Sequence, residues 1–422
     1  MESEKLRIEN FGGIKEMDFE FKSITILIGP QGSGKSITAK LLYFFKNFVS
    51  EITKSLEAEQ TKRELDSNQK EIFINFFPKE SWSKGVFKIT YTINSSFISI
   101  ERAKNNQLVF EYSNDFKSLL TKGRKIFIDE KKKLANDPRS RGYTVRRKTL
   151  ERFNECVHKE ISPIATYQQY FIPAGRSFFA NIQRTIFSFL SENRSLDPFL
   201  IEFGSFYENL KRIYHDLLSN RHDRNERNDS EFDRLVSEVL NGNYLREKDN
   251  DFLVHPDLRK VNLANASSGQ QETLPLMIIL KTLNSLSFAN NGSTLYIEEP
   301  EAHLFPIAQK RIVQLLARTF NHNDFKFQII VTTHSPYILS SFNNLIEAGK
   351  LTLNQPEKIS QIKKVISLKE TINPDLLIGY SINKGENKKI IDNESKLISQ
   401  TILDSVSDEI AIEFDKLLDI EF

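Results

Sequence analysis

Cysteine is nearly absent from this chain of 422 residues, and Cys156 is the only one. A single cysteine cannot form a disulfide within the chain, so a small secreted fold held together by disulfides is excluded. Cys156 stands close to His158, but no known cysteine-enzyme signature surrounds the pair. We therefore interpret Cys156 as a semi-buried bystander rather than as a nucleophile.

Long apolar runs and an excess of one charge are also lacking. No stretch approaches 18 uninterrupted apolar residues, and residues 1–4 have neither the basic nor the apolar region of a secretory signal. Lys and Arg number 58 against 56 Asp and Glu, a net charge of +2, so no global field favours nucleic acid or a membrane surface. The sequence predicts a cytoplasmic protein without a membrane partner.

Core-forming residues, by contrast, are plentiful. Apolar residues make up 39% of the chain and include 33 phenylalanines, which is too rich a composition for a disordered protein. A chain of this length is expected to form about two to three lobes.

The most informative segment is a glycine-rich loop that matches the pattern G-x-x-x-x-G-K-[ST] at every fixed position. A short strand is expected before it at 23–27 and a helix after it at 37–48. Backbone N–H groups of such a loop surround phosphate, the lysine neutralises phosphate oxygens, and the final hydroxyl binds Mg²⁺. The predicted nucleotide-binding residues are Gly29, Pro30, Gln31, Gly32, Ser33, Gly34, Lys35, Ser36 and Ile37.

Two further apolar strands are expected to end in polar residues. The run 295–297 is followed by Glu298 and Glu299, and the run 328–332 is followed shortly by His334. One carboxylate would bind Mg²⁺ and the other would activate water, while the imidazole would contact phosphate or that water. These residues, with the metal ligand Ser36 and with Lys35, form a candidate Mg-ATP site.

A second phosphate-binding surface is predicted at Ser267, Ser268, Gly269 and Gln270, immediately before the apolar helix 274–283. Small residues at the beginning of a helix present free N–H groups to an anion. Because the chain already has one such loop, we expect the second to contact the nucleotide of another subunit.

In this order, the four motifs resemble the head of an ABC-type ATPase. The variants Glu-Glu-Pro-Glu-Ala-His-Leu at 298–304 and Thr-His-Ser-Pro at 333–336 resemble the branch that holds RecF-like, SMC-like and OLD-family ATPases. Within it, the chain is similar to the ATPase components of bacterial anti-phage systems. The resemblance covers the N-terminal 50 residues and the region 260–345.

The resemblance implies a role for each motif. The loop 29–36 would be Walker A, 267–270 the signature loop, Glu298 and Glu299 Walker B with its catalytic glutamate, and His334 the switch histidine. Two heads would enclose two ATP molecules, so dimerisation would depend on ATP. The sequence departs from the family pattern at Ser268, where a second glycine is usual, at Glu298, where Asp is commoner, and at Phe305, where a polar residue is frequent.

The glutamine that senses Mg²⁺ in related heads has two candidates, Gln168 and Gln169. They precede a predicted strand and turn at 170–177, in which Arg176 either approaches phosphate or is a surface residue. The sequence leaves both choices open.

The fold class is predicted to be α/β, a P-loop NTPase of the ABC type with an antiparallel β lobe and an inserted helical subdomain. The β lobe is expected from β-rich runs at 86–93, 97–101 and 108–112. The predicted divisions are 1–115 and 241–345 for the two parts of the head, 116–240 for the helical subdomain, and 346–422 for a C-terminal extension.

Charge is uneven outside the motifs. Residues 116–150 carry twelve Lys and Arg against three Asp and Glu, which predicts either contact with nucleic-acid phosphates or a solvated helical face. Residues 401–422 carry seven acidic side chains against one lysine, on a helical pattern that either packs on the head or docks a partner.

The predicted function is that of an Mg-ATP-hydrolysing sensor or regulator of an anti-phage complex, assembled with itself and with a separate effector. A nuclease is expected as that effector, because the 88 residues after His334 contain no Asp-x-Asp pair of the Toprim kind. The alternatives are a RecF-like or SMC-like ATPase of DNA repair or maintenance and an ATP-gated scaffold with slow turnover.

Overall fold

The computed structural model describes residues 3–136, 142–182, 197–219, 230–247, 250–285, 292–322 and 326–399, together with positions 412, 413 and 415. Of the acidic segment 401–422, only these last three positions are included, so its predicted helical pattern lies largely outside the described residues. None of the helices in these ranges has the length and apolar character of a membrane span.

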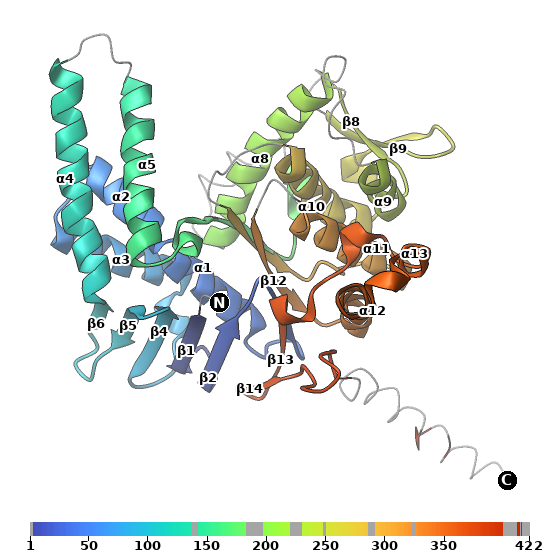
Figure 1. The fold of residues 1–422 in the computed structure, drawn as a ribbon, viewed down its shortest axis with the longest axis horizontal. Coiled ribbons are helices and arrows are strands. Elements are labelled where there is room, and N and C mark those ends of the chain that lie inside the picture. Colours follow the sequence, from blue (N-terminus) through green and yellow to red (C-terminus); the bar gives the residue numbers. More distant parts are fainter. Residues whose placement is uncertain are drawn as a thin grey trace.

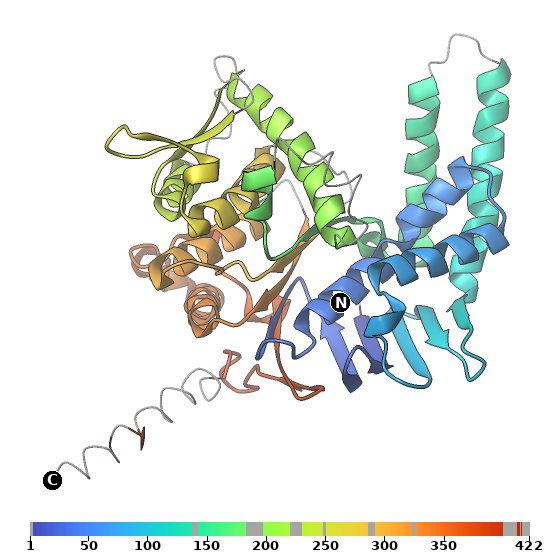
Figure 2. The ribbon, with the colours of Figure 1, turned by 180° about the vertical axis from the view of Figure 1, so that it is seen from behind.

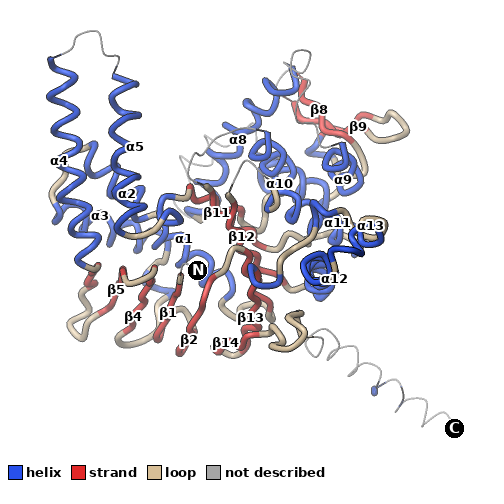
Figure 3. The backbone as a smooth tube through the Cα atoms, viewed as in Figure 1, coloured by secondary structure: helices blue, strands red, loops and turns tan. Residues whose placement is uncertain are grey.

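A six-stranded sheet runs through the middle of the molecule (Figure 3). Five strands are parallel, and β14 pairs antiparallel at one edge. The spatial order is β14 (Glu386–Lys389), β13 (Leu377–Asn383), β3 (Ile24–Ile28), β12 (Phe327–Thr333), β11 (Ser293–Glu298) and β7 (Gln168–Ile172). The strand that leads into the P-loop, β3, therefore lies between β13 and β12.

Both faces of this sheet are buried, each against a different apolar core. On β12, Ile330 packs into the core that contains helix α1 (Lys35–Lys46), whereas Ile329 and Val331 pack into the core on the opposite face. Strands β3, β11 and β12 are buried along their whole length, as expected for parallel strands covered by helices on both sides. The helices that contribute to the second core include α10 (Ser268–Ser285), α11 (Pro306–Phe320) and α12 (Pro336–Asn354).

A second sheet of five antiparallel strands forms the predicted β lobe. Its order is β2 (Ile14–Phe21), β1 (Glu4–Phe11), β4 (Phe87–Ile93), β5 (Ser96–Arg102) and β6 (Leu108–Tyr112). Helices α2 (Phe48–Glu57) and α3 (Lys62–Phe76) complete this part of the chain. Phenylalanine packing joins the lobe to α3, because the Phe11 ring lies 5.6 Å from that of Phe73 and 4.9 Å from that of Phe87.

Helices α4 (Asn114–Asn136) and α5 (Gly142–Glu160) lie side by side and project from the lobe as a two-helix arm (Figures 1 and 2). Gly123 allows the two helices to approach closely, since a Cβ atom there would lie 2.9 Å from the Phe153 ring of α5. Basic side chains of the arm form ion pairs with acidic neighbours, among them Lys131 with Glu59 and Arg146 with Glu57.

The remaining elements lie on the other side of the central sheet from the arm (Figure 1). They are helices α6 (Phe178–Ile182), α8 (Pro198–Ser219), α9 (Ser230–Leu240) and α13 (Ile359–Ile362), and a small antiparallel sheet of β8 (Asn243–Glu247), β9 (Asn250–Val254) and β10 (Lys260–Asn262). On α8, Phe199, Phe203 and Leu210 are buried. Side chains of α8 and α9 join those of α10, α11 and α12 in the core on the face of the sheet opposite to α1.

The predicted α/β fold class with an antiparallel β lobe is confirmed. The strands β2 and β13 were not expected from the sequence, and two core strands fall in ranges predicted for other parts. Strand β7 lies within 116–240, and β13 lies within 346–422, yet both belong to the sheet that carries the P-loop. Each pairs with strands distant in sequence, and local composition cannot reveal such pairing.

Candidate active site

The P-loop connects the end of β3 to the beginning of α1. Gly34 has a φ of 107° and is the N-cap residue of α1, and Gly32 has a φ of 72°, so both occupy the left-handed region that favours glycine. Gly29 is required for a different reason. A Cβ atom at this position would lie 2.0 Å from the carbonyl oxygen of Ile382 on β13.

Parallel pairing brings the ends of three strands to the same edge of the sheet. Ile28 at the end of β3 is opposite Thr333 on β12, and Thr332 is opposite Glu298 at the end of β11. The P-loop, the catalytic turn (residues 298–301) and the switch loop (residues 333–335) therefore begin side by side. Ligands of open α/β sheets bind at such an edge, at the carboxyl ends of the strands.

Lys35 is buried in the P-loop and faces the other two segments. Its Nζ donates to the carbonyl oxygens of Gly29 (2.8 Å) and Pro30 (2.7 Å) and lies 3.5 Å from Nδ1 of His334. Burial lowers the pKa of Lys35, and the nearby carboxylates, of which Glu299 contributes most, oppose this shift. The amine is thus held at the point where the three segments meet.

His334 links Lys35 to Glu299. Its Nε2 lies 3.0 Å from Oε1 of Glu299, while its Nδ1 faces the Lys35 amine. The partners fit a neutral imidazole that carries its proton on Nε2 and donates it to the carboxylate, with Nδ1 as acceptor. The three predicted catalytic residues, Lys35, His334 and Glu299, therefore form one continuous contact chain.

Glu301 is a site residue that the sequence reasoning did not assign. Its Oε1 accepts hydrogen bonds from the Thr333 hydroxyl and from the backbone N–H of His334, both at 2.7 Å. It thereby ties the switch loop to the catalytic turn. The signal was present in the box 298–304, where Glu301 follows Glu299 by two positions, but periodicity gives no reason to place it beside β12.

Glu298 and Ser36 fit the predicted metal site. Glu298 is 5% exposed, one of its oxygens accepts from the backbone N–H of Ala174 (3.2 Å), and the other, Oε1, is buried without a hydrogen-bond partner. Ser36 is exposed at the beginning of α1. Mg²⁺ takes only one or two protein ligands and completes its shell with water and phosphate oxygens, so an orphaned carboxylate oxygen and a free hydroxyl suit it. Among the described residues, no three His, Cys, Asp or Glu side chains cluster as a metal centre.

The signature loop lies at the beginning of α10. Ser267 and Ser268 are exposed, whereas Gly269 is buried so closely that a Cβ atom would lie 2.7 Å from the carbonyl oxygen of His303. The side chain of Gln270 faces its own subunit, where its Nε2 donates to the carbonyl of Leu240 (2.7 Å). The two serines are therefore the members of this loop that another molecule can reach.

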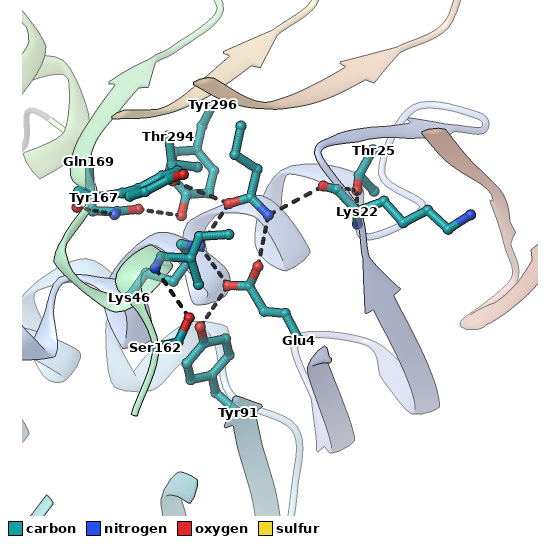
Figure 4. A network of polar contacts seen from close by, with 12 residues as sticks. Glu4, Lys22, Thr25, Lys46, Tyr91, Ser162, Tyr167, Gln169, Thr294 and Tyr296 are labelled. Carbon is teal, nitrogen blue, oxygen red and sulfur yellow. Dashed lines mark hydrogen bonds and ion pairs between the residues drawn. The ribbon is translucent and has the colours of Figure 1, made fainter. Parts of the chain in front are cut away.

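The two candidates for the Mg²⁺-sensing glutamine lie at the wrong edge of the sheet. Gln168 and Gln169 begin β7 and pair with Ser293 and Thr294 at the beginning of β11, whereas Glu298 ends that strand. Figure 4 shows Gln169 in a buried polar network with Thr294 and Tyr296, and its Oε1 accepts from the Tyr296 hydroxyl at 2.8 Å. At about 3.3 Å per residue, β11 separates Gln169 from the catalytic turn by more than ten ångströms.

Arg176 neither approaches the phosphate site nor lies on the surface, the two positions that the sequence left open. Its side chain is fully buried, so it is not a surface arginine, and its guanidinium contacts protein carbonyls rather than the phosphate site. It follows β7 and holds the backbone of the catalytic turn from behind.

A cavity of about 750 Å³ opens beside the P-loop helix. Its walls include Ile37 and Lys40 of α1, and Phe11 and Gly12 at the end of β1. A cavity of this size is typical of small-molecule sites and lies next to the predicted phosphate loop. Of the predicted nucleotide-binding residues 29–37, Ile37 lines this cavity.

Residues 1–339 match the protein family described as AAA ATPase domain. The matched part contains the P-loop, the signature loop, the catalytic turn and the switch loop, so the ATPase family predicted from the motifs is confirmed. No curated protein is significantly similar to the chain.

Similarity to solved structures is distant. The SMC head domain from Thermotoga maritima has 14% identity and a TM-score of 0.37, and the match covers 92% of this chain and 98% of that one. The Smc head domain from Pyrococcus furiosus, bound to the C-terminal domain of ScpA, has 14% identity and a TM-score of 0.38, with 97% and 100% covered. The recombination mediator protein RecF has 12% identity and a TM-score of 0.35, with 92% and 98% covered.

Proposed function

The chain belongs to the AAA ATPase domain family, and from this premise we propose that it binds Mg-ATP at the P-loop and hydrolyses it at the catalytic turn. One observation carries the proposal. Lys35, His334 and Glu299 come from segments far apart in the sequence and meet in one contact chain at the edge of the sheet. A purely structural role does not explain why a lysine, an imidazole and a carboxylate that is 36% exposed lie in contact with one another.

The P-loop residues supply phosphate binding. In a P-loop, backbone N–H groups of the loop and of the first helical turn bind phosphate, and the positive end of the helix dipole favours an anion there. The carbonyls of Gly29 and Pro30 now accept from Lys35, and phosphate oxygens would compete for the same amine. Ser36 and Glu298 would hold the Mg²⁺ ion, which neutralises charge on the phosphates.

Glu299 is the proposed general base. Its side chain is 36% exposed, so a water molecule can reach it, and His334 orients it through the Nε2 hydrogen bond. The carboxylate would accept a proton from the attacking water, and the imidazole would keep the carboxylate directed at the γ-phosphate. Glu301 supports this step indirectly, because it fixes the backbone of His334.

The same surface supports assembly of two heads. Phe305 is 78% exposed and Ile307 is 53% exposed, at the beginning of α11 and directly after the catalytic turn. Exposed apolar side chains beside exposed polar loops are typical of protein interfaces. We place the partner copy here, with Ser267 and Ser268 of one head at the nucleotide of the other.

The biological role that we propose is regulation of an anti-phage complex whose effector, a nuclease, is a separate chain. The support is the motif resemblance of the box 298–304 and of the switch loop. A DNA-maintenance ATPase is the main alternative, and the arm formed by α4 and α5 is where nucleic acid would bind. Ion pairing of Lys131, Arg146 and Arg152 with acidic neighbours reduces the charge that this arm can offer to phosphates.

Two experiments test these assignments separately. Hydrolysis of ATP by the full chain is compared with that of Lys35→Ala, which should lose nucleotide binding; equal rates would refute the site. Purification of the tagged chain from its native operon, with the mass and ATPase rate of the eluted complex, tests the role. A second protein whose activity depends on ATP supports the defence regulator, whereas a lone dimer stimulated only by DNA supports DNA maintenance.

A further inference from the structure

Arg176 is the largest side chain that is fully buried in the described part of the molecule, and it lies between the signature helix α10 and the catalytic turn. Burial of a guanidinium is costly unless every donor is matched. The cost of this burial is offset by the carbonyl groups and the carboxylate that surround the guanidinium.

The guanidinium fastens the backbone of the catalytic turn. Nη1 donates to the carbonyl oxygen of Glu298 (2.7 Å), and Nη2 donates to that of Glu299 (3.1 Å). Glu299 has a φ of +43°, a left-handed conformation that is unfavourable for a residue with a side chain. The turn that positions the catalytic carboxylate is therefore strained. Arg176 contacts both of its carbonyls, and the backbone N–H of Ala302 also donates to that of Glu299 (3.1 Å).

The other side of Arg176 is fastened to the signature helix. Nε donates to the carbonyl oxygen of Glu272 (2.9 Å), and the Glu272 carboxylate lies 3.4 Å from Nη2. The same carboxylate accepts from the backbone N–H groups of Arg176 (2.9 Å) and Ser177 (2.8 Å). Glu272 lies one helical turn after Ser268, so it moves with the signature loop.

A proline makes the first turn of α10 separable from the rest of the helix. Pro275 stands inside α10, has no N–H to donate, and crowds the carbonyl four residues before it. Nε of Arg176 donates to the carbonyl of Glu272, which is adjacent in the chain to the carbonyl that Pro275 crowds. The signature turn is thus bonded to Arg176 at a point where its bonding to the remaining helix is weakened.

We propose that Arg176 and Glu272 are positioning residues that couple the signature loop to the catalytic turn of the same subunit. The inference rests on the proposed function, because it requires ATP hydrolysis between two heads. When the signature loop of one head engages nucleotide in its partner, the first turn of α10 is fixed. Glu272 and Arg176 pass this constraint to Glu298 and Glu299, so that a head hydrolyses its own ATP fastest when the partner site is also filled.

The test uses mixed dimers of two differently tagged full-length chains, at concentrations where the rate no longer depends on concentration. In one dimer the partner carries Glu299→Gln, so its site is filled but inactive; in the other it carries Lys35→Ala, so its site is empty. The rate of the single active head should be at least about fivefold higher in the first dimer, the lower end of typical coupling.

Arg176→Lys in the active head should abolish this ratio, because an ammonium keeps the charge but cannot span the carbonyls of Glu298, Glu299 and Glu272 together. The ratio should fall to about one whatever the absolute rate. Glu272→Gln, which keeps the side-chain size and removes the charge, should lower the ratio as well, and it decides the question if Arg176→Lys does not fold.

Arg318→Lys is the matched control. Arg318 lies on α11, away from the catalytic turn, and it is also buried and pairs with an acidic residue, Glu370, at 2.7 Å. Its substitution should therefore leave the ratio unchanged. A wild-type ratio near one, or a ratio that survives Arg176→Lys and Glu272→Gln, would overturn the coupling. Absence of hydrolysis in the unmodified dimer would instead overturn the proposed ATPase.

Discussion

At the scale of single residues, Gly29 shows how a distant strand constrains the P-loop. Gly29→Ala would place a Cβ atom 2.0 Å from the carbonyl oxygen of Ile382, and backbone atoms cannot rotate away as a side chain can. We expect a loss of about 1–3 kcal/mol in the free energy of unfolding, the usual cost of overpacking, together with weaker ATP binding. Urea denaturation and titration with a fluorescent ATP analogue measure both, and native values for both would contradict the close approach.

Site residues that occupy fixed positions of a motif could be predicted from the sequence. Residues that hold those motifs in place through contacts with distant segments could not. Lys35, Glu299 and His334 were found because each follows a recognisable apolar strand or glycine pattern, and parallel strands end at one edge. Glu301 and Glu272 act through backbone contacts with segments far along the chain. Arg176 was misjudged because an isolated arginine in a turn gives no sign of full burial.

At the scale of secondary-structure elements, α1 is joined to the β lobe by a buried ion pair. Nζ of Lys46 donates to Oε1 of Glu4 at 2.6 Å, and the same oxygen accepts from the Tyr91 hydroxyl at 2.6 Å (Figure 4). Gln328 of β12 donates to the other oxygen of Glu4. The network therefore connects the lobe, the P-loop helix and the central sheet, at the edge opposite to the nucleotide site.

Removal of one partner of this ion pair should lower the free energy of unfolding more than removal of both. Lys46→Met leaves the Glu4 carboxylate buried without its cation, and we expect a loss of about 3–5 kcal/mol in the free energy of unfolding. The double variant Glu4→Gln, Lys46→Met should lose less than the single variant. A double-mutant cycle by chemical denaturation checks this, and strictly additive losses would contradict the pairing.

Strand β13 shows that local composition does not reveal which segments belong to the central sheet. Its range falls in a segment expected as an extension, yet it pairs along the full length of β3 and its Tyr380 hydroxyl accepts from the backbone N–H of Glu20 on β2 (2.8 Å). Helices and strands with clear periodicity were predicted, whereas the pairing of β13 depends on the tertiary fold.

Truncation distinguishes an extension from a core strand. A chain ending at Asn354 loses β13 and β14 and exposes the edge of β3, so we expect loss of cooperative unfolding and of ATP binding. A chain ending at Ser399 keeps the whole sheet, and its Tm should stay within about 1 °C of the full chain, a change of about 1 kcal/mol or less. Calorimetry of both chains tests this; native ATP binding by the shorter chain would contradict the role of β13.

At the scale of the whole molecule, we propose that a second head lies over the catalytic turn. Phe305→Ser removes an exposed ring from the proposed contact without touching the P-loop. We expect the Kd of the ATP-bound dimer to rise about tenfold, equal to about 1.4 kcal/mol, while ATP affinity of the single head stays unchanged. Analytical ultracentrifugation gives the dimer constant, and Leu258→Ser, at the exposed tip between β9 and β10, is the control that should leave it unchanged.

The proposed hydrolysis depends on Glu299, which we expect to activate the water that attacks ATP. Glu299→Gln keeps the size of the side chain and its contact with His334 but removes the base. The most direct measurement is the single-turnover rate of ATP hydrolysis by this variant, with its mass recorded in Mg-ATP. We expect the rate to fall at least about 100-fold, the lower end for a general base, with a persistent dimer and native ATP affinity. Hydrolysis at the native rate would show that Glu299 is not the general base.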